Sequence, residues 1–331
     1  MSWLAVALVA CADGRPRSSS EFESEFAPHL SAGATLLGVL GDAESSAEAI
    51  GRIADVDVLP DGTVVIADDL RNQIFLARPS YSRLEGFGRT GQGPDDFGVL
   101  RDIAAIDGHT VAALDVANMR VTLWDVENAP PTSRGGFRLP FPVSRICGVA
   151  GRLLAAGLYE GMTIHEFALD GHLIRSFGAP LHPHPLHAQA ATKGPLTCLD
   201  GRVIQAAGLL PVVSSYTLEG SMESSDTIPG FVQVGLLEAG PGRAGYHENE
   251  EYGYHHAWTS ANVRGDGLEV FAGISSPGNG TYEYESYASW TVNAAGQVDR
   301  GADWSWTVGA RRAGLTVFYH NVPFPRVVVW R

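Results

Sequence analysis

The sequence predicts an all-β protein, a six-bladed β-propeller in which each blade has four antiparallel strands. Two observations lead to this prediction: a repeat of about 47 residues, and Asp-Gly turns between alternating apolar runs. A repeat of that length matches one four-stranded propeller blade. The composition agrees, because 39 glycines and only 18% charged residues favour many tight turns over long solvated helices.

The repeat is clearest between residues 54–77 and residues 101–124. Both segments begin with an alternating apolar strand, turn at Asp61-Gly62 or Asp107-Gly108, and continue into a β-branched strand that ends in aspartate. Asp-Gly pairs between strand-like runs predict two-residue hairpins. Weaker copies follow at residues 147–157 and 198–208, with turns at 170–171, 219–220, 265–267 and 295–296.

The last blade is predicted to borrow a strand from the N-terminal part of the chain. The segment from Trp306 onward has room for only three strands, and an exposed hydrophobic edge invites aggregation. The stretch Gly33–Asp42 is apolar and belongs to none of the repeats. We expect it to be the outer strand of the last blade, which closes a ring of six blades; five or seven blades are the alternatives.

The N-terminal region predicts export and a lipid anchor. Residues 1–10 form an apolar run too short to span a bilayer, and Leu8-Val9-Ala10-Cys11 looks like a bacterial lipobox, in which Cys11 is the lipid attachment site. The run has no basic n-region, so an apolar N-terminus with a chance cysteine is the alternative. Residues 11–31 are rich in Ser and Glu and predict a flexible tether. Residues 32–331 are then a single propeller domain, expected to be a monomer.

The net charge of −14 limits the partners of this protein. It argues against a general affinity for nucleic acid, which requires many Lys and Arg contacts to phosphate. It also opposes adsorption to an anionic bilayer, so membrane contact is expected through the lipid anchor only.

The first two repeats resemble the bacterial six-bladed β-propeller proteins of the NHL-like kind, many of which are predicted lipoproteins. The positions that carry the resemblance are Asp55-Val56-Asp57-Val58, Asp61-Gly62, Asp68, Asn72, Ile74, Phe87-Gly88, Gly91, Gly93-Pro94 and Phe97. The resemblance is strong over residues 35–125 and weakens along the chain. It implies the fold and a place in the bacterial cell envelope, facing the periplasm or the exterior, and it implies no activity.

The stretch Gly86–Gly91 spells the dinucleotide pattern G-x-G-x-x-G, but its context does not fit. A dinucleotide loop must open a helix whose N-terminal amides hold the pyrophosphate. Here Pro94 follows three residues after Gly91, and a strand is expected near Asp102. We therefore interpret the stretch as a turn between blades, in which Phe97 packs, and we expect no cofactor.

Two long loops, residues 179–194 and 229–256, carry most of the candidate metal ligands. These are His182, His184, His187 and His255, together with His247, Glu248, Glu250 and Glu251. Imidazole and carboxylate groups suit zinc, but the spacing matches no closed structural site. Solvated loop residues are the preferred interpretation.

Five basic residues fall near the starts of successive inner strands: Arg52, Arg101, Arg145, Lys193 and His256. If they face one mouth of the channel, they form a basic ring suited to an anionic ligand. Ordinary arginines paired with nearby carboxylates are the alternative. A shift of one residue in register reverses the face of each side chain.

Cys147 and Cys198 occupy nearly equivalent places in neighbouring blades. A disulfide is permitted outside the cytoplasm. Because inner strands of neighbouring blades do not pair, we expect their Cα atoms to be too far apart, and two buried free thiols are favoured.

Three functions follow from these features. The favoured one is noncatalytic: an envelope lipoprotein that binds a small molecule or a protein partner on one propeller face. The second is a metal-dependent lyase or lactonase-type hydrolase with its site at the channel mouth. The third is a structural scaffold of an envelope complex, with an exposed apolar patch on the long loops.

Overall fold

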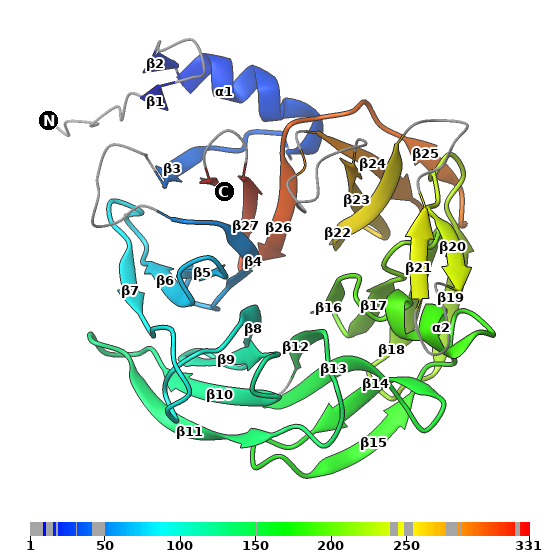
Figure 1. Cartoon of the computed structure of the whole chain (residues 1–331). Coiled ribbons are helices and arrows are strands. Elements are labelled where there is room, and N and C mark those ends of the chain that lie inside the picture. Colours follow the sequence, from blue (N-terminus) through cyan, green and yellow to red (C-terminus); the bar gives the residue numbers. More distant parts are fainter. Residues whose placement is uncertain are drawn as a thin grey trace, which may run out of the picture.

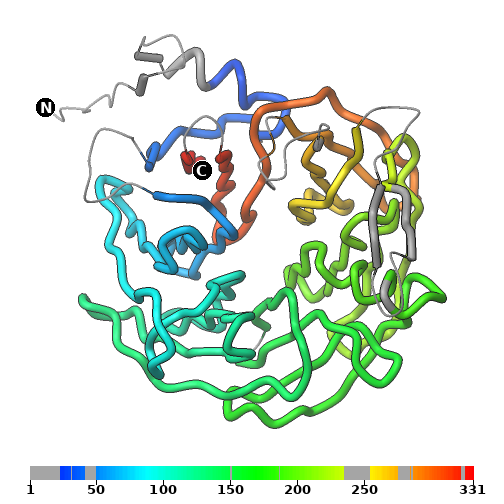
Figure 2. Tube along the Cα trace, viewed as in Figure 1, coloured from blue at the N-terminus to red at the C-terminus, as the bar shows by residue number. Residues whose placement is uncertain are grey.

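The computed structural model is a ring of six four-stranded antiparallel sheets around a central channel (Figure 1). It describes residues 9–10, 16–17, 19–30, 32–41, 50–149, 151–238, 244–247, 254–275, 284, 286–321 and 325–331. The all-β, six-bladed prediction is confirmed. The six blades follow one another around the ring in the order of the sequence (Figure 2).

The first three blades follow the chain in order. Blade 1 is β4 (Ile53–Val58), β5 (Val64–Asp68), β6 (Gln73–Ala77) and β7 (Glu85–Phe87). Blade 2 is β8 (Leu100–Ala105), β9 (Thr110–Asp115), β10 (Arg120–Asp125) and β11 (Thr132–Arg138). Blade 3 is β12 (Arg145–Val149), β13 (Arg152–Tyr159), β14 (Met162–Phe167) and β15 (Leu173–Phe177). In each, the first strand lies innermost.

The other three blades complete the ring. Blade 4 is β16 (Leu196–Leu199), β17 (Arg202–Ala206), β18 (Val212–Thr217) and β19 (Met222–Thr227). Blade 5 is β22 (His255–Arg264), β23 (Gly267–Ser275), β24 (Tyr287–Val292) and β25 (Val298–Arg300). Blade 6 is β26 (Thr307–Arg312), β27 (Leu315–His320), β28 (Arg326–Trp330) and β3 (Leu36–Leu40).

The ring closes as the sequence predicts, with a strand from the N-terminal region completing the last blade. β3 pairs antiparallel with β28, and Val39 lies opposite Val328. Thr35 and Arg331 also exchange two backbone hydrogen bonds of 2.6 and 2.9 Å. The edge of blade 6 is therefore covered by the chain's own N-terminal strand.

The Asp and Asn residues of the repeat fix the backbone at the entry to the first two blades. Asp68 accepts hydrogen bonds from the backbone of Gly51 and Arg52, at the start of its own blade. Asn72 reaches into the next blade and accepts from the Leu100 backbone N–H at 2.8 Å. Asp115 repeats the role of Asp68 by accepting from the residues just before β8. These contacts explain why the repeat is built on Asp and Asn at those places.

The Gly86–Gly91 stretch is a link between blades, as expected. It leaves β7 and returns to β8 through turns, without a helix. Phe97 is fully buried in the core between blades 1 and 2. Gly88 has φ 79°, and a Cβ there would lie 2.6 Å from the Phe97 ring, so this glycine is needed for both reasons.

Part of the predicted tether packs against the propeller. The chain forms α1 (Ser19–Phe26) and a short 3₁₀ helix, η1 (Ala27–His29), at the rim of blade 6 (Figure 1). Phe26 is fully buried, with its ring 4.9–5.7 Å from those of Trp304, Trp306, Phe318 and Trp330. The packed part of the chain thus begins before residue 32. We call residues 25–30 the strap.

Polar contacts fix the C-terminal half of the strap between blades 5 and 6. His29 stacks on Trp304 and contacts the Glu269 carboxylate at 3.1 Å. Arg264 donates to the carbonyl of Pro28, and Arg311 to that of His29. Both guanidiniums therefore bind the carbonyl end of the short helix, where a cation is favoured.

The remaining elements lie outside the blades. They are the short pair β1 (Val9–Ala10) and β2 (Pro16–Arg17), the hairpin of β20 (Gly235–Glu238) and β21 (Ala244–His247), and α2 (Pro185–Ala191). Within the ranges given above, no helix is both long and apolar enough to cross a bilayer. Cys11 lies outside the described residues.

Candidate functional site

The candidate site is the central channel, which is lined by the six inner strands. We call the face on which these strands begin the upper face, and the face on which they end the lower face. Two cavities occupy the channel, an upper one of about 70 Å³ and a lower one of about 260 Å³. Cys198, Leu199 and Arg312 line both cavities, so these residues mark the boundary between them.

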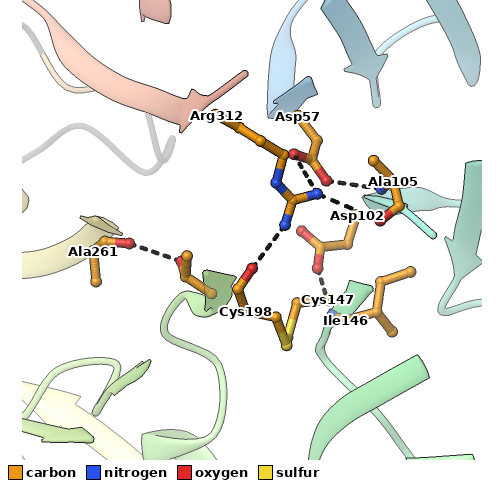
Figure 3. The surroundings of a disulfide bond; sticks show 9 residues. Asp57, Asp102, Ala105, Ile146, Cys147, Cys198, Ala261 and Arg312 are labelled. Carbon is orange, nitrogen blue, oxygen red and sulfur yellow. Dashed lines mark hydrogen bonds and ion pairs between the residues drawn. A yellow bond between two sulfur atoms is a disulfide. The ribbon is translucent and has the colours of Figure 1, made fainter. Parts of the chain in front are cut away.

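Arg312 closes the channel at that boundary. It ends the inner strand of blade 6, and its Nη2 donates to the Cys198 carbonyl of blade 4 at 2.7 Å (Figure 3). Its Nη1 lies 3.4 Å from the Ala105 carbonyl of blade 2 and 3.5 Å from the Asp57 carboxylate of blade 1. One side chain thus connects four of the six blades.

The upper cavity is lined by acidic side chains that connect neighbouring inner strands. Asp55 accepts from the Ile103 backbone N–H at 3.2 Å, and Asp102 accepts from that of Ile146 at 2.6 Å. Arg145 contacts the Asp102 carboxylate at 3.2 Å. These links run from blade 1 to blade 2 and from blade 2 to blade 3, around the channel wall.

Asp55 and Asp102 are close enough to affect one another. Burial in the channel wall, and then the Asp102 carboxylate, raises the pKa of Asp55 well above its usual value. Burial also raises the pKa of Asp102, against the lowering effect of Arg145. Two like groups in one low-dielectric space resist double ionisation, so the pair tends to keep a proton.

This acidic pair has limited room for chemistry. Paired carboxyl groups with separated protonation can act as a general acid and base. The space beside them is about 70 Å³, which is enough for a few water molecules. Both carboxylates also accept hydrogen bonds from backbone N–H groups of the next inner strand, so the pair serves mainly to join the inner strands.

The lower cavity is wider and more apolar. Its walls come from the ends of the inner strands and the turns that follow them, at Pro60, Ile106, Val149 and Leu199, and from Leu218 just after β18. Arg312 lies at its inner end, and Asp107 and Asp200 are the acidic residues of its lining. A concave, mostly apolar space with a few polar groups is typical of a small-molecule site.

Cys147 and Cys198 form a disulfide, so the expectation of two free thiols is wrong. Their Cα atoms are 5.5 Å apart, which is within the range that a disulfide spans. Inner strands of neighbouring blades do not hydrogen-bond, but they converge on the channel axis, and this brings β12 and β16 close enough. The bond joins blades 3 and 4 in the wall of the upper cavity (Figure 3).

The structure does not bring the five basic candidates to one cavity. Arg145 lines the upper cavity, whereas Arg52 pairs with Asp69 at 2.6 Å and Lys193 is exposed beyond α2. Arg101 lies on β8, and its carbonyl is 3.5 Å from Arg145 Nη1. His256 is fully buried among aromatic rings, and burial lowers its pKa to about 4.

The candidate histidines fall in two places. The rings of His182 and His184 each lie 4.9 Å from that of His187, between blades 3 and 4 along the chain. His255 starts β22 in blade 5. Over the part of the chain that the structure describes, no group of three His, Cys, Asp or Glu side chains could hold a metal ion. The side chain of His247, and Glu248, Glu250 and Glu251, lie outside it.

Sequence reasoning missed the residues that organise the channel. Arg312 belongs to the tandem pair Arg311-Arg312, the last two residues of the inner strand β26. Asp55 and Asp57 alternate with valine on β4, which places both on the face of the strand that is turned toward blade 2, where they accept from Ile103 and Ala105. An alternating acid pair on an inner strand and an arginine at the end of another are the signals that could have identified the channel wall.

Comparisons with known proteins support the fold. No protein-family model matches the chain, and no curated protein does. A candidate exported protein from Bacteroides fragilis aligns with a TM-score of 0.61 and 11% identity, over 90% of this chain and 95% of that one. A member of the DUF4221 family from Bacteroides vulgatus gives a TM-score of 0.56 and 6% identity, over 90% and 98%. A protein of unknown function from Bacteroides thetaiotaomicron gives 0.54 and 13%, over 90% and 76%. At these identities the similarity is one of fold.

Proposed function

We propose that the protein is a noncatalytic, monomeric binding protein of a bacterial envelope that takes a small molecule into its lower cavity. The observation that supports this is the closure of the channel by Arg312. It leaves about 260 Å³ of largely apolar space open toward the lower face. Such a space fits a molecule somewhat smaller than those bound by typical drug-sized pockets.

The upper cavity supports catalysis less well than the lower cavity supports binding. A substrate would have to reach the acidic pair through a space of about 70 Å³. The scaffold alternative predicts apolar patches on the loops 179–194 and 229–256. The large apolar side chains exposed in the described residues lie elsewhere, at Leu70, Val99, Met119, Met162, Ile174 and Met222.

Binding is tested by a thermal-shift screen of small molecules on two matched variants. Leu218→Trp places an indole in the wall of the lower cavity, whereas Ile174→Trp places one on the exposed side of β15. We expect ligands that raise the Tm of the wild type and of Ile174→Trp, but not that of Leu218→Trp. Ligands that stabilise all three proteins equally bind outside the lower cavity and contradict the proposal.

Anchoring through Cys11 is part of the same proposal and has a separate test. Two acyl signals are needed for stable anchoring, since each buried CH₂ contributes about 0.8 kcal/mol. Cells fed a labelled fatty acid should label the wild type but not Cys11→Ser. Unlabelled wild-type protein would refute the anchor and leave the binding proposal standing.

A further inference from the structure

We propose that the ligand of the lower cavity is a small molecule with one carboxylate and an apolar body, whose carboxylate binds the guanidinium of Arg312. This inference rests on the proposed function, because it names the chemical class that the same cavity takes. Three features of the cavity support it: an incompletely used arginine, apolar walls and an acidic rim.

Arg312 keeps hydrogen-bonding capacity for a ligand. Its one short hydrogen bond is to the Cys198 carbonyl, at 2.7 Å. The contacts of Nη1 with Ala105 and Asp57 are long, at 3.4 and 3.5 Å. These contacts all use Nη1 or Nη2, and 22% of the side chain is exposed. A guanidinium in this state can offer two parallel donors to a carboxylate, its preferred partner.

The charge of Arg312 is also poorly compensated within the protein. Its nearest carboxylate, Asp57, accepts from the backbone N–H groups of Val58 and Ala105, both at 2.7 Å. Burial raises the pKa of Asp57, which weakens it further as a counter-charge. A ligand carboxylate next to Arg312 can therefore make the short paired contacts that Asp57, at 3.5 Å, does not make.

The walls require that the rest of the ligand be apolar. Ile106 is buried, and Val149, Leu199 and Leu218 are partly buried around the same space. Covering this surface removes apolar area from water, which favours binding. A carboxylate with an aliphatic or aromatic body satisfies both the walls and Arg312.

Two acidic residues of the lower cavity disfavour a ligand that carries a second negative charge. Asp107 and Asp200 both line the lower cavity. Asp107 accepts hydrogen bonds from the backbone of His109 and Thr110 at 2.9 and 2.7 Å, which hold its pKa below the usual value and keep it ionised. A dicarboxylate would place its outer charge near these residues, so a monocarboxylate is preferred.

Three probes of equal chain length test the proposal: hexanoate, its neutral amide hexanamide, and the dicarboxylate adipate. Binding to the full-length protein is measured by calorimetry at low ionic strength and neutral pH. We expect hexanoate to bind roughly tenfold more tightly than either of the others, the size of effect that one charged hydrogen bond supports. In Arg312→Gln we expect hexanoate and hexanamide to bind equally.

Arg312 also holds blades together, so Arg312→Lys is the companion variant. Lysine keeps the charge but loses the planar pair of donors, and it should bind hexanoate with intermediate affinity. Equal binding of hexanoate and hexanamide by the wild type would overturn the ligand class while leaving a binding cavity. Failure of all three probes to bind overturns this inference, and a ligand found by the Leu218→Trp screen would show that the proposed function survives it.

Discussion

The guanidinium of Arg312, at the end of the inner strand of blade 6, donates a 2.7 Å hydrogen bond to the Cys198 carbonyl in blade 4, across the channel. Blades that are not neighbours in the ring are thus joined through its centre. In most of the ring, contacts run from one blade to the next, as with Asp55 and Ile103. Arg312 is therefore a cross-brace as well as the boundary between two cavities.

Removing this brace should destabilise the whole ring. We expect Arg312→Ala to lower the free energy of unfolding by about 1.5–3 kcal/mol, the cost of a buried hydrogen bond with a charged donor. Arg300→Ala is the matched control, because Arg300 pairs with Asp303 on an exposed surface. Its effect should stay within about 1 kcal/mol. Urea unfolding at pH 7 measures both, and equal effects would show that the Cys198 contact contributes nothing.

Phe26 should contribute more to stability than any other residue of the strap. Its fully buried ring contacts four aromatic side chains, so Phe26→Ala leaves a cavity between blades 5 and 6. We expect a loss of about 3–5 kcal/mol in unfolding free energy. Met222→Ala, at a residue that is 52% exposed, is the control and should change little. A small effect of Phe26→Ala would mean that the strap is a tether after all.

The disulfide should stabilise the inner ring. Cys147 and Cys198 are separated by 51 residues, and closing a loop of that length restricts the unfolded chain. We expect Cys147→Ala with Cys198→Ala to lower the unfolding free energy by about 2–4 kcal/mol. A reducing agent should destabilise the wild type and leave the double variant unchanged. Two titratable thiols at these positions in the native oxidised protein would contradict the bond.

Asp55 should make stability fall as the pH rises. Burial and Asp102 raise the pKa of Asp55 in the folded protein above its unfolded value, so the folded state holds its proton more tightly. The folded state is thus favoured below the unfolded pKa, near 4, and this advantage is lost as pH rises through the folded pKa.

Asp55→Asn tests this directly, because the amide resembles the protonated acid and does not titrate. We expect the variant to gain stability relative to the wild type as the pH is raised from 4 to 8. The same substitution at Asp266, on the exposed turn between β22 and β23, is the control. Parallel stability curves for the wild type and Asp55→Asn would show that Asp55 does not couple to folding.

The sequence predicts the blades well because their signals are local. Asp61 and Gly62 lie in a turn, in which Asp61 accepts a hydrogen bond from the Thr63 backbone N–H and Gly62 has φ 91°. Both features involve residues within four positions of one another, so the local sequence is enough to predict them. Asp68 marks a contact with the entry to its blade that Asp115 repeats in the next blade. The ring closure is predicted because the strand count leaves one unassigned strand, Gly33–Asp42, and one strand missing from the last blade.

The closure of the channel and the docking of the strap depend on contacts between residues far apart in the sequence, which no local pattern predicts. The reach of Arg312 to Cys198 depends on how far each inner strand lies from the axis, and the same convergence brings Cys147 and Cys198 together. The strap lies at the end of the Ser/Glu-rich segment 11–31, and its docking depends mainly on one residue, Phe26, which packs among Trp304, Trp306 and Trp330.

The pairing of β3 with β28 has a consequence for how the protein is made. Val39 is synthesised well before its partner Val328. The edge of β3 that pairs with β28 must therefore stay unpaired until β28 has been made. Such long-range pairings form slowly, and an unpaired strand edge is prone to join another chain meanwhile. A nascent chain that stalls before residue 326 lacks β28, so the edge of β3 stays open to such pairing.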